Sequence, residues 1–344
     1  MDDIDDLFGI PSPGESAATG AKSRTRPIGP AAHDSAVVAL GERLPPSIYL
    51  GTSSWSFPGW AGLVYDTPAR ESDLAKAGLT AYARHPLLRT VGIDRGFYKP
   101  LAAAEFGAYA AQVPEPFRFM VKAPALVTDE VKRDDKGRAT GDNPHFLDAA
   151  LAFEQFAKPA IAGLGEKAGP LVFQFSPLSR ACLANVPALI ARLHAFMFSL
   201  ERQCANFSHP PLFAVEIRNP ELLTRGFADA LRDAGARYCL GIHDRMPNAK
   251  AQLPLLRALW PGPMVVRWNL HAGRKYGQAK ADYAPFNRLI DEDPATRETL
   301  AKVAAATARA GYPVYIVANN KAEGSAPLTL AKLAEAITAA NPAD

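Results

Sequence analysis

Charged side chains occur at the ends of several short apolar segments of this sequence. Glu216 and Arg218 lie in LFAVEIRNP, Lys122 closes FRFMVK, and Asp94 closes TVGID. In each segment the side chains alternate with period two, so the polar residue shares a face with the small or apolar residue two positions before it. Carboxylates exchange protons, guanidiniums bind phosphate or carboxylate with paired hydrogen bonds, and a lysine amine anchors anions or acts as a nucleophile. If these side chains meet, they predict acid–base chemistry on a polar or charged substrate.

Polar residues also occur at the C-terminal ends of other apolar segments, and together with Glu216, Arg218, Lys122 and Asp94 they form a candidate site. The candidate catalytic residues are Glu216, Lys122 and Asp94, and the candidate substrate-binding residues are Arg218, Arg267, Asn269, His243, Gln174, Asn319, Asn320, Trp55 and Tyr98. A charge buried alone costs several kcal/mol, so we predict two ion pairs, Lys122 with Glu216 and Asp94 with Arg267. A purely structural ionic network is the alternative interpretation.

Eight elements of one kind would be needed to bring these residues together. The apolar segments cover residues 48–52, 89–94, 117–123, 171–175, 212–220, 238–243, 264–269 and 313–318, and a helical pattern follows each of them. This rhythm predicts an α/β fold, a TIM (β/α)₈ barrel, in which the carboxyl ends of the strands form one mouth. We expect helices over residues 186–203 and up to Ala340 after a Ser325 cap, and others capped by Asn143 and Asn219.

The segment before the first strand has a different composition. Residues 1–46 are rich in Pro, Gly, Ser, Ala and Asp and predict a disordered N-terminal tail with a short helix over residues 35–44, followed by the barrel domain over residues 47–344. The acidic and apolar DDIDDLF motif in this tail could dock a partner, although a solvated terminus is favoured. A charged loop over residues 128–143 is a candidate lid or a flexible insertion.

Composition favours a soluble, cytoplasmic protein. The chain has 344 residues, of which 48% are hydrophobic, and a net charge of +3, too close to balance to indicate nucleic acid by itself. Cys182, Cys204 and Cys239 are an odd number without CxxC spacing, which argues against a disulfide framework or a zinc ribbon. The acidic start does not match a signal peptide, and no apolar run reaches the ~18 residues of a membrane span.

No cofactor is indicated by a motif. The sequence contains no GxGxxG, Walker or GxSxG pattern, so the cofactor is unknown and no nucleotide cofactor is expected. His243, Asp244, Glu216, Asp94 and His271 form a conceivable metal-ligand set, but the seven histidines show no HxH or HxxxH grouping and the nearby cations oppose a metal ion. A catalytic metal is therefore not favoured.

Two loop regions could add binding groups. The aromatic residues of the first two loops, Trp55, Phe57, Trp60, Phe97 and Tyr98, could stack against a sugar ring or a base, although packing is the commoner role of such residues. Gly273, Arg274, Lys275 and Gly324 follow the seventh and eighth strands, where barrels of this class often bind phosphate.

Several phrases together resemble the YecE-like family, number 72 among the domains of unknown function. They are GTSSWSFPGW, TVGIDRGFYKP, FRFMVKAP, GPLVFQFSP, FAVEIRNP, VVRWN and VYIVANNKAEGSAP, in order between residues 48 and 330. The resemblance implies a TIM barrel and no established activity. Where that family usually has VEIN this chain reads VGID, and where it has RFHG this chain reads RWNLHAG. Chemistry that depends on that glutamate or histidine is therefore not carried over.

Three functional hypotheses follow. The first is an enzyme, a hydrolase or a lyase, that acts on an anionic or sugar- or phosphate-containing small molecule at the barrel mouth, with Glu216 as acid–base group and Lys122 and Arg218 neutralising charge. The second is a nucleic-acid-binding protein or phosphodiesterase that grips the backbone with Arg274, Lys275 and RDDKGR. The third is a non-catalytic scaffold with a partner-binding acidic tail. No feature specifies an oligomeric state.

Overall fold

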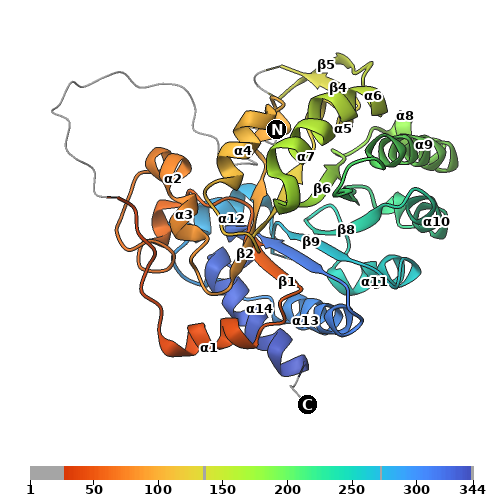
Figure 1. Cartoon of the computed structure of the whole chain (residues 1–344). Coiled ribbons are helices and arrows are strands. Elements are labelled where there is room, and N and C mark those ends of the chain that lie inside the picture. The colour runs from red at the N-terminus through yellow and green to blue at the C-terminus, as the bar shows by residue number, and fades with distance from the viewer. Residues whose placement is uncertain (1–26, 135–136, 272, 342–344) are drawn as a thin grey trace.

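The computed structural model describes residues 27–134, 137–271 and 273–341 and contains a closed barrel of parallel strands surrounded by helices (Figure 1). The strands follow the order β1-β10-β9-β8-β7-β6-β3-β2 around the barrel. Their bounds are β1 (Ile48–Thr52), β2 (Leu88–Ile93), β3 (Arg118–Lys122), β6 (Ala168–Gln174), β7 (Leu212–Glu216), β8 (Arg237–Ile242), β9 (Met264–Trp268) and β10 (Val314–Ala318). The predicted (β/α)₈ barrel is confirmed.

The inward faces of the strands change from apolar to polar along the barrel axis. Seven buried residues fill the interior, namely Met120, Val172, Ala214, Cys239, Val265, Tyr315 and Val317. Two positions further along their strands stand Lys122, Gln174, Glu216, Gly241 and Arg267. Parallel pairing sets Gln174 beside Glu216 and Gly241 beside Arg267, which brings the polar residues to one level. The alternate residues, such as Phe173 and Val215, face outward into the core beneath the helices.

The helices cover the outside of the barrel. They are α1 (Ser35–Arg43), α2 (Glu71–Ala77), α3 (Leu79–Tyr82), α4 (Ala103–Ala110), α5 (Ala125–Thr128), α6 (Ala149–Ala152), α7 (Lys158–Leu164), α8 (Arg180–Leu183), α9 (Val186–Cys204), α10 (Arg225–Asp233), α11 (Ala249–Ala258), α12 (Tyr276–Tyr283), α13 (Pro294–Arg309) and α14 (Ala326–Ala340). Short turns of helix are η2 (Pro58–Trp60), η3 (Arg95–Phe97), η4 (Phe153–Ala157), η5 (Gly165–Lys167), η6 (Pro220–Leu222) and η7 (Asn320–Ala322). Within the described residues, none of these helices combines the length and apolar character needed to cross a membrane.

Two of the predicted helix caps are wrong. Asp148 caps α6, and its side chain accepts from the backbone N–H of Leu151. The Asn143 amide instead donates to the carbonyl oxygens of Leu126 in α5, at 2.9 Å, and of Asp129, at 2.7 Å. Thr224 caps α10, and Asn219 precedes only the short turn η6. The helix predicted over residues 186–203 and the closing helix after Ser325 are present as α9 and α14.

The predicted boundary between tail and barrel lies inside the folded unit. Residues 1–26 of the predicted tail lie outside the described residues, but residues 35–43 form α1, which packs against α14 (Figure 1). Asp34 caps this helix, and the Arg89 guanidinium, which belongs to β2, donates to the carbonyl oxygens of Gly41 and Leu44 at its end. The short helix predicted over residues 35–44 is present as α1, and residues 27–46 have a defined structure in which Leu40 and Leu44 are buried.

The charged loop over residues 128–143 contains an antiparallel pair of strands, β4 (Val131–Arg133) and β5 (Ala139–Asp142). Residues 135 and 136 between them lie outside the described residues. Arg133 pairs with Asp129 at 2.7 Å, and Glu130 accepts a hydrogen bond from the backbone of Ser179 in the loop after β6. The insertion thus has local structure of its own, and its role as a lid stays a prediction.

Candidate functional site

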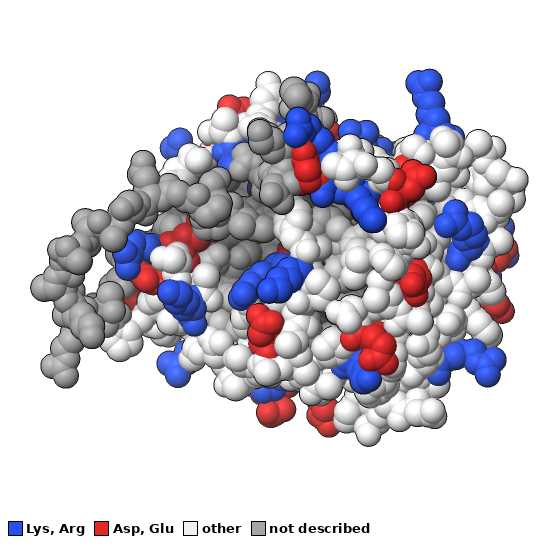
Figure 2. All heavy atoms as spheres, turned by 90° about the horizontal axis from the view of Figure 1, so that it is seen from above, with Lys and Arg blue, Asp and Glu red and all other residues white. Residues whose placement is uncertain are grey.

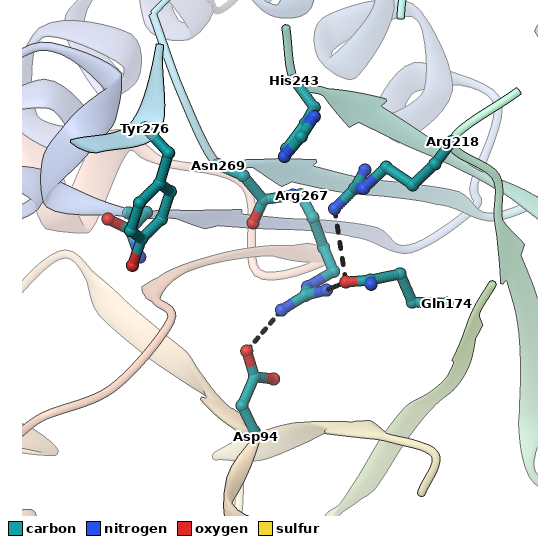
Figure 3. Close-up of a pocket in the computed structure, with 8 residues that line it drawn as sticks. Asp94, Gln174, Arg218, His243, Arg267, Asn269 and Tyr276 are labelled. Atoms are coloured by element: carbon teal, nitrogen blue, oxygen red, sulfur yellow. Dashed lines mark hydrogen bonds and ion pairs between the residues drawn. The ribbon is translucent and has the colours of Figure 1, made fainter. Parts of the chain in front are cut away.

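The polar strand ends surround a cleft at the C-terminal mouth of the barrel. It encloses about 310 Å³, part of it open to solvent, and its lining consists of Asp94, Gln174, Arg218, His243, Arg267, Asn269, Tyr276 and Asn319 (Figure 3). All of these except Tyr276 belong to the residues predicted from the sequence. Arg267 lies at the centre, with Asp94 on one side and His243 and Arg218 pointing in from the other (Figure 3).

Glu216 is the fully buried carboxylate that holds the site together. Its Oε1 lies 2.5 Å from Nη1 of Arg218, and its Oε2 lies 2.9 Å from Nη1 of Arg267. The amide of Asn269 donates to Oε1 at 3.0 Å. Burial by itself raises the pKa of Glu216, but the two guanidiniums lower it to about 2. Glu216 therefore stays ionised near neutral pH and fixes both arginines.

The remaining hydrogen bonds of Arg267 span the cleft floor. Its Nη2 lies 2.5 Å from Oδ2 of Asp94, and its Nη1 donates to Oε1 of Gln174 at 2.8 Å. The predicted pair of Asp94 with Arg267 is thus formed. Arg218 donates to the same Gln174 oxygen over a longer 3.3 Å. Gln174 and the carboxylates of Glu216 and Asp94 consequently orient the two guanidiniums.

Lys122 is buried behind the residues that line the cleft. Its ammonium lies 3.5 Å from the centre of the Phe97 ring, a cation–π arrangement. Burial lowers the pKa of Lys122 well below 10.5, while the negative charge of Asp94 acts in the opposite direction. The sequence predicts an ion pair of Lys122 with Glu216, and in the structure Arg218 and Arg267 contact that carboxylate. Lys122 still contributes to lowering the pKa of Glu216.

A glycine makes room for the central ion pair. Gly241 is the inward residue of β8, and a Cβ atom there would lie 2.8 Å from Oε1 of Glu216 and 2.9 Å from Nη1 of Arg218. Both distances are shorter than real Cβ contacts allow. Gly241, in the LGI of β8, therefore leaves the space in which the Arg218 guanidinium meets Glu216.

His243 belongs to the cleft wall and contacts the next residue in the chain. Its Nδ1 lies 2.6 Å from Oδ1 of Asp244. Burial and the nearby Arg218 guanidinium lower the pKa of His243, although the Asp244 carboxylate opposes them. The hydrogen bond from His243 in turn lowers the pKa of Asp244.

Three predicted binding residues lie elsewhere. Asn320 is fully buried, and its Oδ1 accepts hydrogen bonds from Nε1 of Trp60 at 3.2 Å and from the backbone of Ala326 at 2.9 Å. Trp55 is buried and donates to the carbonyl of Leu74 at 3.1 Å. Tyr98 is exposed and packs edge-on against Phe97, outside the cleft lining. Asn320 and Trp55 hold loops in place rather than line the cleft.

The predicted phosphate loop is occupied by its own ion pairs. Arg274 lies 2.7 Å from Asp291 and 3.1 Å from Asp282. His271, a member of the conceivable metal set, lies 3.6 Å from Asp291 rather than beside His243. In the part of the chain that the structure describes, no three His, Cys, Asp or Glu side chains are grouped to hold a metal ion.

Tyr276 is the cleft residue that sequence reasoning missed. It begins α12 and approaches the cleft opposite Arg218 (Figure 3). The Lys321 ammonium lies 4.3 Å from the centre of its ring, and Lys321 also donates to Oδ1 of Asn319 at 3.2 Å. The available signal was an aromatic residue directly after Arg274 and Lys275, in the loop that follows β9.

Comparison with known proteins gives the family. The model of the family described as protein of unknown function DUF72 matches residues 49–343, so the chain belongs to this family and the resemblance seen in the sequence is confirmed. A DUF72 family protein from Enterococcus faecalis is similar in structure, with a TM-score of 0.53, 17% identity, and coverage of 85% of this chain and 95% of that one. A DUF72 family protein from Thermotoga maritima is similar with a TM-score of 0.52 and 19% identity, and the match covers 84% of this chain and 98% of that one. These similarities show the shared barrel fold. No curated protein matches the sequence.

Proposed function

We propose that this DUF72 family member is an enzyme that binds a small anionic or sugar-phosphate-like molecule in the cleft and acts on it by acid–base chemistry. One observation carries the proposal. The guanidiniums of Arg218 and Arg267 line the cleft although only 3% of each side chain is exposed. Charges this deep cost several kcal/mol unless they are paired, and a fold that needed only packing would be as stable with apolar residues there.

The arrangement favours one orientation of a bound anion. Asp94 stands on one side of Arg267, whereas Arg218 and His243 stand on the other (Figure 3). An anionic group is repelled by Asp94 and attracted by Arg218, whose bond to Gln174 is long at 3.3 Å and therefore exchanged at little cost. The uncharged end of the ligand then faces Asp94, whose carboxylate can accept a hydrogen bond or a proton.

Glu216 has a different role here from the one expected from the sequence. With a pKa of about 2, it is a poor proton donor or acceptor near neutral pH, since efficient acid–base groups have pKa values near the working pH. We assign it the positioning of Arg218 and Arg267. Acid–base chemistry then falls to the groups that line the cleft, of which Asp94 was a candidate from the sequence.

The basic residues outside the cleft support a small ligand more than nucleic acid. Figure 2 shows Lys and Arg interspersed with Asp and Glu on the viewed face, with uncharged areas between them. Arg138 pairs with Asp134 at 2.7 Å and Arg274 with Asp291 at 2.7 Å, so two of the arginines expected to grip a backbone already contact carboxylates. Binding of nucleic acid would have to break these pairs.

A thermal-shift titration with inorganic phosphate, sulfate and small sugar phosphates tests the proposal. A ligand present at 100 times its Kd stabilises the fold by about 2.7 kcal/mol. We expect this stabilisation in the wild type and its loss in Arg218→Gln. Arg225→Gln is the matched control, because Arg225 forms an exposed pair with Asp229 on α10. No stabilisation of the wild type by any of these anions, or an equal response in Arg218→Gln, would refute the anion site.

A second variant separates binding from chemistry. Asp94→Asn removes the negative charge that opposes an anion, so sulfate should bind more tightly than to the wild type. Turnover of any sugar phosphate identified by the titration should instead fall. An Asp94→Asn protein with full turnover would remove Asp94 from the acid–base chemistry.

A further inference from the structure

His243 presents one ring nitrogen to the cleft. Its ring points from the end of β8 into the space above Arg267 and Asn269 (Figure 3), and 11% of its side chain is exposed. The other ring nitrogen, Nδ1, is directed at the Asp244 carboxylate, 2.6 Å away. Asp244 itself lies outside the cleft lining, with 35% of its side chain exposed.

The carboxylate defines which nitrogen carries the proton. An ionised carboxylate only accepts hydrogen bonds, so Nδ1 must be the donor in this contact. The backbone N–H of Arg245 also lies near Nδ1, but at 3.4 Å it is the weaker contact. Neutral His243 therefore has its lone pair on Nε2, the nitrogen that faces the cleft.

We propose that His243 and Asp244 form a proton-transfer pair in which Nε2 of His243 takes a proton from a hydroxyl group of the bound molecule. This proposal rests on the proposed function, because it requires a ligand in the same cleft. It makes His243, a candidate from the sequence for substrate binding or metal ligation, a catalytic residue, and it gives Asp244 the role of a positioning residue.

The proton transfer needs no group other than the ligand hydroxyl and His243. The O–H bond of the ligand breaks, its electron pair stays on oxygen, and the proton forms the Nε2–H bond of an imidazolium. The Asp244 carboxylate stabilises that imidazolium, and the Arg218 guanidinium offsets the charge on the oxygen. Burial and Arg218 lower the pKa of His243, so the ring is neutral and able to accept a proton near neutral pH.

The charges around His243 come from several elements. Arg218 follows β7 and opposes protonation, whereas Glu216 of β7 and the adjacent Asp244 favour it. Across the cleft, Asp94 and Arg267 form a pair of opposite charges at 2.5 Å, so their effects on the ring largely cancel. A bound anion would be the largest change in this balance and should raise the pKa of His243.

¹⁵N NMR of the full chain labelled with ¹⁵N-histidine tests the pair, because it shows which ring nitrogen of His243 carries the proton. The signals that are missing from the spectrum of His243→Gln are those of His243. In the wild type at pH 8 we expect His243 to carry its proton on Nδ1. Asp244→Asn should lose this tautomer, since an amide can donate to Nδ1 instead. Asp233→Asn is the matched control, because Asp233 contacts Nε2 of half-buried His194 at the same 2.6 Å and should affect that ring only.

The second measurement is the pKa of His243 with and without sulfate, an anion whose charge does not change near neutral pH. We expect saturating sulfate to raise the pKa of His243 by at least about 0.5, a small fraction of the effect of a direct unit charge. A wild-type ring protonated on Nε2 overturns the pair, whatever sulfate does. If sulfate stabilises the wild type but not Arg218→Gln and His243 does not respond, the pair is wrong and the anion site stands. If sulfate does not bind, the proposed function fails and the pair fails with it.

Discussion

The sharpest prediction concerns the carboxylate beneath the cleft. Glu216→Gln keeps the shape of the side chain but removes the negative charge shared by Arg218 and Arg267. The amide can accept from one guanidinium, but it presents an NH₂ group to the other. Two buried cations then remain close together with only Asp94 to balance them. The variant should be folded but considerably less stable than the wild type.

Two separate arguments give a similar value for the loss of unfolding free energy in Glu216→Gln. Lowering the pKa of a carboxyl from 4.5 to about 2 corresponds to about 3 kcal/mol in favour of the ionised form at pH 7. Removing one partner from a buried ion pair generally costs about 3–5 kcal/mol, because it leaves an uncompensated charge. We therefore expect Glu216→Gln to lower the free energy of unfolding by about 3–5 kcal/mol.

Urea unfolding between pH 3 and pH 8 measures this difference. Because the folded-state pKa of Glu216 lies below its ordinary value, the stabilisation is fully present above about 4.5 and is lost as the pH falls toward about 2. The difference in unfolding free energy between the variant and the wild type should be constant from pH 6 to 8 and should become smaller below pH 4.5. Glu298→Gln is the control, since the pair of Glu298 with Lys302 is exposed and screened by solvent and should contribute little to stability. A gap below 1 kcal/mol at pH 7, or one that widens in acid, would refute the positioning role of Glu216.

Three further predictions follow from the site. Gly241→Ala should lower the free energy of unfolding by about 1–3 kcal/mol through overpacking of the central ion pair and should weaken sulfate binding in a thermal-shift titration, whereas Gly226→Ala on the surface of α10 should do neither. Asn320→Ala leaves the Trp60 indole N–H without its acceptor and should cost about 1–3 kcal/mol in urea unfolding, with sulfate affinity unchanged because Asn320 does not line the cleft. Sulfate affinity measured by calorimetry should rise about 3-fold between pH 7.5 and 5.5 in the wild type, since an anion favours protonated His243, and should lose this pH dependence in His243→Gln.

The barrel and most of the cleft could be predicted because both follow from a strand's period of two. Once Val172 was taken as interior, Gln174 had to be interior as well, and parallel pairing put it beside Glu216. The same rule placed Arg267 and Asn269 correctly. Strand periodicity was sufficient here because every strand contributes its last inward residues to one mouth.

What could not be predicted depends on side-chain direction beyond the ends of the strands. Arg218 lies after β7, and the alternation alone does not show that its guanidinium turns back to Glu216 two residues earlier. Asn319 and Asn320 are adjacent in the sequence, yet one lines the cleft and the other accepts from Trp60 on the opposite side of the loop. Such loop residues are fixed by contacts with segments distant in sequence, and no local pattern encodes them.

The charge balance of the site explains why orientation matters here more than affinity. Arg218 and Arg267 are matched by Glu216 and Asp94, so an entering anion meets a nearly neutral wall rather than an open positive field. A cleft surface with no net charge binds an anion weakly. When its positive and negative charges lie on opposite sides, however, the anion binds in one orientation. In the proposed orientation the uncharged part of the molecule faces Asp94, and its anionic part lies beside Arg218 and His243. A buried ionic network that orients Arg218 and Arg267 suits the proposed proton transfer, since the reacting atoms must be held about 3 Å apart for transfer to occur.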